Sequence, residues 1–267
     1  MTKLGKIFHI IRNVINQPKI LLLLADNAFI FKKKILKKYP QTSLPVVDIL
    51  DIIPKLNETI QPYSYLEGGS TAIDLVLLKS LAKQFKPCNY LEIGSWRGES
   101  VANIVETGAD CTIINLSEDE MQAMKLPTGY IKQHHLYSKD LANIHFIHHN
   151  SHTFDYSSLN KKFDLIFVDG DHHYDSVKKD TQKVFNLLRD DNSIIVWHDY
   201  GKTPESIRYD VFAGILDGLP SSEHKNLYHV SNTLCAIYTK QKLNTQPLSY
   251  PTQPNKVFEI NIKAKKL

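Results

Sequence analysis

Residues 163–175, FDLIFVDGDHHYD, place carboxylate and imidazole side chains directly after an apolar run. A second apolar run ends in the same way at residues 193–200, SIIVWHDY. Side chains of these two kinds can transfer protons or hold a metal ion when they are brought together. The two junctions are therefore the first candidates for a reaction centre, with Asp169, His172 and His198 as candidate catalytic residues.

A divalent cation is one interpretation of these junctions. Asp169 and Asp199 leave what should be neighbouring strands, so they could share one ion, and magnesium prefers such oxygen ligands. The imidazole of His198 beside them weakens the case for magnesium and admits manganese, iron or zinc. The candidate metal ligands are thus Asp169, His198 and Asp199. The alternative is that His198 is a general base and that no metal binds.

The elements that must position these residues are short apolar strands that alternate with helices. Strands that are apolar throughout indicate a parallel sheet covered by helices on both faces. The expected strands are 89–93, 111–116, 143–148, 163–168 and 193–197, followed by an antiparallel pair at 227–230 and 234–239. The expected helices are two within 1–40, one from a cap at Ser70 or Thr71 to about Phe85, and others at 100–107, 118–124, 174–189 and 206–216.

Polar residues follow four of these strands. They are the groups 92–94, 150–151, 169–172 and 198–200. In open α/β sheets, ligands bind beyond the carboxyl ends of the strands. The pattern therefore predicts one site at that edge of the sheet.

The turn after the first of these strands, within NYLEIGSWRGES, indicates what would bind there. Its glycines, Gly94 and Gly98, are spaced G-x-x-x-G and not G-x-G-x-x-G, so a dinucleotide fingerprint is absent. Glu92 would repel a phosphate and would suit a cofactor with an ammonium group. S-adenosylmethionine (SAM) is such a cofactor, because its amino and sulfonium groups are positive.

At this point the sequence resembles a known family. NYLEIGSWRGES is similar to the first motif of class I SAM-dependent methyltransferases, and FDLIFVDGDHHY and HDY resemble a bacterial branch of them, similar to catechol- and macrocin-type O-methyltransferases. The resemblance covers roughly residues 70–240. It implies a Rossmann-like α/β fold with a mostly parallel seven-stranded sheet, an antiparallel closing strand and helices on both faces.

The resemblance also implies roles for particular residues. The methionine end of SAM would be surrounded by Glu92, Gly94, Ser95 and Gly98. In the family, the residue that binds the ribose hydroxyls is usually an acid. In this sequence Asn115 occupies that position, and Glu118 is the nearest acid. Contacts to adenine would come from Asn150 and Ser151, and the pocket beside the sulfonium would be closed by Asp169, Asp171 and His172.

The N-terminal segment differs in charge from the rest of the chain. Residues 1–40 contain nine Lys and Arg and one acidic residue, whereas the whole chain has 32 and 28. Leu4, Ile7, Phe8, Ile11 and Ile15 repeat at helical spacing between the basic residues. Such a helix packs on the body or on a second subunit, or it binds an anionic membrane surface; a nucleic-acid partner is not expected.

Taken together, the sequence predicts a basic helical extension with a linker (1–69), a methyltransferase domain (70–240) and a tail (241–267). The expected activity is O-methylation of a small hydroxylated acceptor, such as a sugar or glycan intermediate, with SAM and with Mg²⁺ or Mn²⁺ as an optional metal. Two alternatives are a metal-dependent hydrolase or oxygenase and a non-catalytic SAM-fold interaction protein. The few, scattered cysteines favour a cytoplasmic protein, peripheral to the inner membrane face if the basic segment binds lipid.

Overall fold

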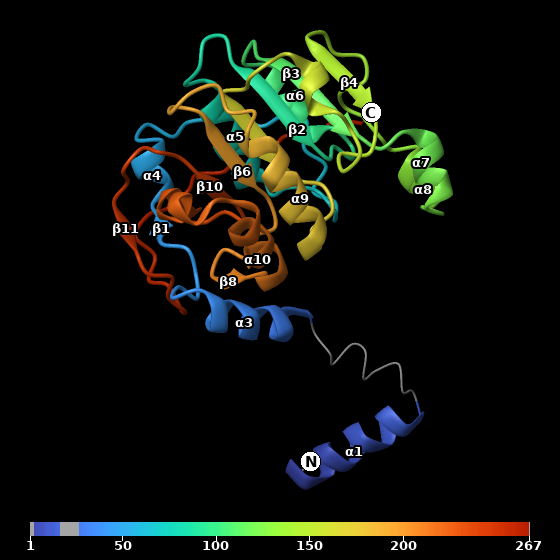
Figure 1. Cartoon of the computed structure of the whole chain (residues 1–267), viewed down its shortest axis with the longest axis vertical. Coiled ribbons are helices and arrows are strands. Elements are labelled where there is room, and N and C mark those ends of the chain that lie inside the picture. Colours follow the sequence, from blue (N-terminus) through green and yellow to red (C-terminus); the bar gives the residue numbers. More distant parts are fainter. Residues whose placement is uncertain (1–2, 17–26, 267) are drawn as a thin grey trace.

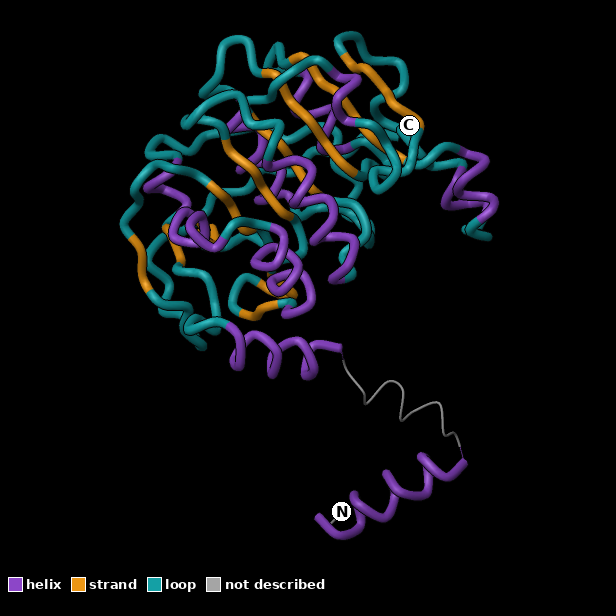
Figure 2. Tube along the Cα trace, in the orientation of Figure 1, coloured by secondary structure: helices purple, strands orange, loops and turns teal. Residues whose placement is uncertain are grey.

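A computed structural model describes residues 3–16 and 27–266 of this chain (Figures 1 and 2). The break expected between the two helices within 1–40, at Gln17-Pro18 where a proline interrupts the helical pattern, lies outside these residues. The helices are α1 (Lys3–Asn16), α3 (Asn27–Lys38), α4 (Ile49–Ile52), α5 (Ala72–Ala82), α6 (Glu99–Val105), α7 (Glu118–Ala123), α8 (Thr128–Ile131), α9 (Tyr174–Phe185) and α10 (Tyr209–Gly218), with the 3₁₀ turns η1 (Tyr156–Leu159) and η2 (Ser221–Asn226). The strands are β1 (Val46–Val47), β2 (Asn89–Ile93), β3 (Asp110–Asn115), β4 (Ile144–His148), β5 (Leu165–Val168), β6 (Ile194–Trp197), β7 (Gly201–Thr203), β8 (Ser206–Ile207), β9 (Leu227–Val230), β10 (Ala236–Tyr238) and β11 (Thr245–Gln246).

The main sheet has the order β11-β1-β9-β10-β6-β5-β2-β3-β4. From β6 to β4 the strands are parallel, and β10 runs antiparallel to both β6 and β9. These seven strands are the predicted sheet with its closing strand. The sheet has two more strands than predicted, because β1 pairs parallel with β9 and β11 pairs antiparallel with β1. The extension and the tail thus satisfy an edge that would otherwise be open.

Complete burial explains why the central strands could be recognised in the sequence. Every residue of β5 and β6 is buried. One face packs against α9 and α10, whose core residues include Val184 and Phe212, and the other packs against α5 and α6 through Leu78 and Ile104. A strand covered on both sides has no polar face, so its sequence is apolar throughout.

The helix predicted for residues 206–216 begins later than expected. Ser206 and Ile207 form β8, which pairs with β7 in a small antiparallel sheet. The amide of Arg208 donates to the carbonyl of Tyr200, and only then does α10 begin. The prediction was wrong at this start, because a short hairpin after β6 was read as the first turn of the helix.

The turn after β2 is held against the end of β5. Gly94 has φ +83°, and a Cβ atom there would lie 2.4 Å from the carbonyl oxygen of Asp169 and 2.5 Å from the Cα atom of Gly170. A side chain would therefore push apart two strand ends that carry predicted site residues. Glycine is required here for close approach as well as for its backbone conformation.

Gly94→Ala and Gly108→Ala form a matched pair of tests. Both glycines have φ +83°, but a Cβ atom at Gly108 meets nothing within 4 Å. Gly108→Ala should cost about 1 kcal/mol through its φ alone, whereas Gly94→Ala should cost at least about 3 kcal/mol, since backbone must move. Urea unfolding of both variants measures the difference. Equal losses of stability would contradict the close approach.

Candidate active site

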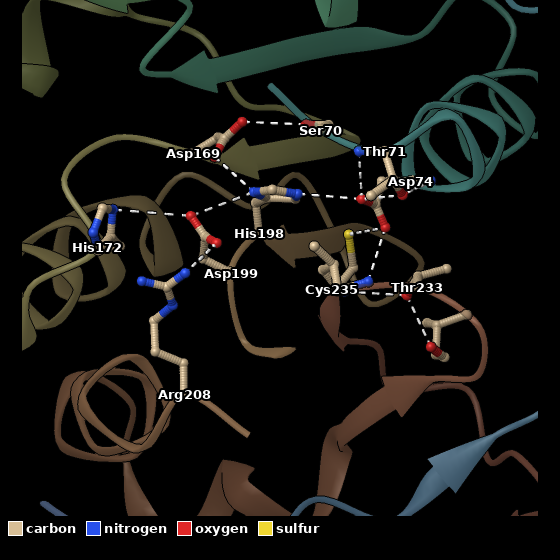
Figure 3. Close-up of polar contacts among 12 residues, drawn as sticks. Ser70, Thr71, Asp74, Asp169, His172, His198, Asp199, Arg208, Thr233 and Cys235 are labelled. Carbon is tan, nitrogen blue, oxygen red and sulfur yellow. Dashed lines mark hydrogen bonds and ion pairs between the residues drawn. The ribbon is translucent and has the colours of Figure 1, made fainter. Parts of the chain in front are cut away.

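The predicted site residues gather at the carboxyl edge of the parallel strands. Figure 3 shows His198 at the centre, with side chains from α5 and from the ends of β5 and β6 turned toward it. A small hollow opens beside this group. It is lined by Val168, Asp169, Gly170, Asp171, His172, Val177, Trp197, His198, Asp199 and Val211.

The imidazole of His198 lies among three carboxylates. Its Nδ1 atom is 3.1 Å from Asp169 Oδ1 and 3.5 Å from Asp199 Oδ2. Its Nε2 atom is 3.2 Å from Asp74 Oδ2 on the other side of the ring. The side chain of His198 is only 7% exposed, so solvent screens these charges weakly.

These contacts determine whether the imidazole of His198 is protonated. Burial alone would lower the pKa of His198, but the charge of Asp169 and hydrogen bonds to Asp169, Asp199 and Asp74 raise it well above the ordinary value. The pKa of Asp169 is raised, chiefly by burial. A protonated imidazole has no lone pair, so it neither accepts a proton nor binds a metal. His198 can take up either role only after its Nδ1 proton has left.

Asp74 is the residue that sequence reasoning missed. It is wholly buried at the start of α5, in a capping box with Thr71, the N-cap that was predicted. Its Oδ1 atom accepts a hydrogen bond from the amide of Leu234 (2.9 Å), and its Oδ2 atom accepts one from the amide of Thr71 (2.8 Å). The signal in the sequence is the Thr-x-x-Asp box. That box indicates a helix start, and nothing in it indicates contact with His198.

The other side of the hollow is held by Asp199. Its Oδ1 atom pairs with Arg208 Nη2 at 3.0 Å, and its Oδ2 atom lies 3.9 Å from His172 Nδ1. Asp199 also has a positive φ of 58°, a backbone conformation that packing must maintain in a residue with a side chain. Its carboxylate is therefore fixed in place by its neighbours.

The loop after β5 is divided between the hollow and the start of α9. Half-exposed His172 lines the hollow, whereas His173 is the N-cap residue of α9. Asp171 also lines the hollow, but its carboxylate accepts hydrogen bonds from His173 and from the hydroxyl of Ser176 (2.7 Å). Asp171 thus fixes the start of α9 as well.

Glu92 lies beneath the glycine turn and not on its surface. Its carboxylate is wholly buried and accepts hydrogen bonds from Tyr90 Oη (2.5 Å) and Ser100 Oγ (2.7 Å). Burial raises its pKa to about 8. Contact between Glu92 and an ammonium group therefore stays a prediction. Ser95, also buried, makes no hydrogen bond of regular geometry through its hydroxyl.

The residues predicted to hold adenosine are engaged in local structure. Asn115 Nδ2 donates to the carbonyl of Ser95 at 2.7 Å and lies 2.8 Å from His134 Nδ1. Asn150 Oδ1 accepts from the amide of His152 (2.9 Å), which is an Asx turn, and the carbonyl of Ser151 accepts from Lys183 (2.9 Å). Both positions follow strands at the correct edge, but their roles toward a cofactor stay predictions.

A segment between β3 and β4 covers the glycine turn, and it was not predicted. The amide of Tyr137 donates to the carbonyl of Arg97 (2.8 Å). The indole of Trp96 stacks on Tyr130 with ring centroids 4.7 Å apart. A Cβ atom at Gly98 would lie 2.2 Å from Ser138 Oγ, so this glycine makes room for the covering segment.

The donor atoms fit a divalent cation. Asp169, His198 and Asp199 each offer one ligand atom, and these atoms lie within 4.8 Å of one another. Asp74, on the far nitrogen of His198, stands where a carboxylate orients a metal-bound imidazole. In the part of the chain that the structure describes, the histidine-rich stretch 134–152 forms no comparable group.

Glu92→Gln tests the buried carboxyl group. Between the ordinary pKa of 4.5 and about 8, the folded protein keeps a proton that the unfolded chain has lost. The free energy of unfolding therefore falls as pH rises through this window, by at most about 1.4 kcal/mol per pH unit. Glu92→Gln removes this titration, so its stability relative to the wild type should increase with pH. Urea unfolding at several pH values, with exposed Glu118→Gln as control, measures it, and parallel curves would contradict the assignment.

Comparison with known proteins finds a family model that is similar to the central part of the chain. A family model described as a methyltransferase domain matches residues 91–200, which include the glycine turn and the ends of β5 and β6. No curated protein sequence matches significantly.

Several solved structures are similar in fold. The SAH-bound Podospora anserina methyltransferase PaMTH1 is 18% identical, with 81% of this chain and 88% of that chain covered and a TM-score of 0.45. An O-methyltransferase from Bacillus cereus in complex with SAH is 15% identical (79% and 90% covered, TM-score 0.44). The O-methyltransferase TomG from Streptomyces achromogenes, in complex with SAM, is 15% identical (65% and 82% covered, TM-score 0.41).

Proposed function

We propose that the protein transfers a methyl group from SAM to a hydroxyl oxygen of a small polyhydroxylated acceptor, such as a sugar or glycan intermediate, in the cytoplasm, because residues 91–200 match a family model described as a methyltransferase domain. The observation that carries this proposal is the convergence of Asp169, His198 and Asp199 beside the glycine turn of β2. Transfer to oxygen needs an aligned acceptor and the removal of its proton. The half-exposed side chains of Asp171 and His172 offer hydrogen bonds to such an acceptor.

The glycine turn supports SAM as the cofactor. When bound, SAM supplies an electrophilic methyl group on a positively charged sulfur. Gly94 lets this turn approach the backbone of Asp169 and Gly170 closely, so the turn lies directly beside the end of β5 that carries the candidate catalytic carboxylate. Asp169 would lie toward the sulfonium, where its negative charge favours binding.

A divalent cation would be held by Asp169, His198 and Asp199. When bound there, the ion lowers the pKa of the acceptor hydroxyl. Asp74 would accept the Nε2 proton of His198 and so direct the Nδ1 lone pair toward the ion. An imidazole among the ligands favours Mn²⁺ over Mg²⁺.

The same three side chains also fit a second candidate, a metal-dependent hydrolase or oxygenase. That activity uses the metal ligands but leaves the glycine turn without a role. Binding of SAM separates the two candidates, because only a methyltransferase, or a non-catalytic protein of the same fold, requires it.

Calorimetry with the full-length protein tests the cofactor. We expect binding of both SAM and SAH, and we expect it to persist in a chelator, since the proposed metal contacts the acceptor. The chelator should instead lower methyl transfer by at least about tenfold. Lack of binding by either nucleoside would overturn the proposed function, and transfer unaffected by the chelator would remove the metal from it.

Asp199→Asn and Asp74→Asn test the metal site. Asp199→Asn removes a charged ligand, and Asp74→Asn weakens the partner of His198 Nε2; each should reduce Mn²⁺ affinity by about 10- to 100-fold. Asp191→Asn is the control, because this carboxylate is 80% exposed and pairs with Lys240. Mn²⁺ binding is measured by electron paramagnetic resonance. Equal affinity in all three variants would show that the ion binds elsewhere.

A further inference from the structure

Helix α1 exposes its apolar side chains. Figure 1 shows it standing apart from the sheet and its covering helices. Six of its large apolar residues are between 50% and 77% exposed. They are Leu4, Ile7, Phe8, Ile10, Ile11 and Ile15. Exposure of this extent in one helix marks an interaction surface.

The apolar residues of α1 share one side. At 3.6 residues per turn they fall, with Val14, within an arc of less than half the circumference. The opposite arc carries Lys6, His9, Arg12 and Asn13. The helix contains no acidic residue. From Leu4 to Ile15 it therefore combines an apolar side with a side that carries basic and polar residues.

We propose that α1 lies flat on the surface of an anionic lipid bilayer. The apolar arc would enter the boundary between headgroups and acyl chains, and Lys6 and Arg12 would lie beside lipid phosphates. Among the helices that the structure describes, none is long and apolar enough to cross a membrane. The geometry of α1 is that of a helix in the plane of the surface.

Charge favours an anionic bilayer over a second copy of the chain as the partner of α1. Two α1 helices that packed through their apolar arcs would cover those arcs but leave Lys6 and Arg12 of each copy on the outer sides. The helix supplies no carboxylate to compensate them. Anionic lipid supplies that charge at every position along the helix.

The next described helix, α3, continues the basic surface and joins it to the body. Phe31 stacks on Tyr174 of α9 with ring centroids 5.0 Å apart, and Ile35 is wholly buried. The outer side of α3 carries exposed Lys32 and Lys37, and the helix has no acidic residue. A bilayer that binds α1 could therefore also contact the lysines of α3, a second cationic helix that is fixed to the sheet domain.

Sedimentation with lipid vesicles tests the proposal on the full-length protein. We expect binding to vesicles of phosphatidylcholine with about one third phosphatidylglycerol, and at least about tenfold weaker binding to phosphatidylcholine alone. Ile7→Asn with Ile11→Asn should weaken binding by more than about tenfold, since both side chains leave the bilayer. Lys6→Gln with Arg12→Gln should weaken binding only to the anionic vesicles, by about fivefold for each charge.

The matched control is Ile260→Asn with Ile262→Asn. These residues of the C-terminal tail are 74% and 66% exposed, and the same substitution there should leave vesicle binding unchanged. Calorimetry with SAM on each variant checks that the rest of the protein still binds its proposed cofactor.

Three results would overturn the proposal. The first is failure to bind anionic vesicles, and the second is an equal loss of binding in the tail control. The third is a dimer, detected by light scattering, that Ile7→Asn with Ile11→Asn abolishes, because α1 would then cover a second copy. None of these results bears on methyl transfer, so the two proposals fail separately.

Discussion

The buried imidazole of His198 joins three parts of the chain that are far apart in sequence. Asp74 at the start of α5, Asp169 after β5 and Asp199 after β6 all contact it. Removing one partner of such a buried group would leave an uncompensated charge, at a cost of about 3–5 kcal/mol. The ends of β5 and β6 and the first turn of α5 therefore hold one another in place, and the hollow beside them has fixed walls.

The charges of this group can be counted in two states. With His198 protonated, the imidazolium and Arg208 face three carboxylates, and one negative charge is left over. With a divalent cation in place of the Nδ1 proton, the imidazole is neutral and the charges of the ion and Arg208 balance the three carboxylates. A positive sulfonium nearby would balance the first state instead. When His198 is protonated, this group keeps one uncompensated negative charge, which supports the proposal of a nearby cation, either the sulfonium of SAM or a divalent ion.

The sequence predicted best those strands whose apolar pattern has a single cause, which is burial on both faces of the sheet. β5 and β6 are buried on both faces, so an apolar run and its polar end were sufficient to locate Asp169, His198 and Asp199. Asp74 was missed because a capping box satisfies its local pattern, and its contact with His198 depends on packing across the sheet. Asn115 and Asn150 were placed at the correct edge, but the Asn115 amide donates to Ser95 of the neighbouring turn, and the Asn150 amide accepts within its own turn, since Asn side chains readily capture backbone groups.

The N-terminal extension is coupled to the site through Asp217 of α10. Its carboxylate accepts hydrogen bonds from Lys38 (2.6 Å), from Tyr39 and from the hydroxyl of Tyr174 (2.6 Å). These contacts hold the pKa of Asp217 far below its usual range, although burial opposes them. Tyr174 begins α9 directly after the loop that carries Asp171 and His172, so the helix α3 that ends at Lys38 is anchored one residue away from that loop. The carboxylate of Asp217 therefore fixes the end of α3 against the start of α9, beside the wall of the hollow.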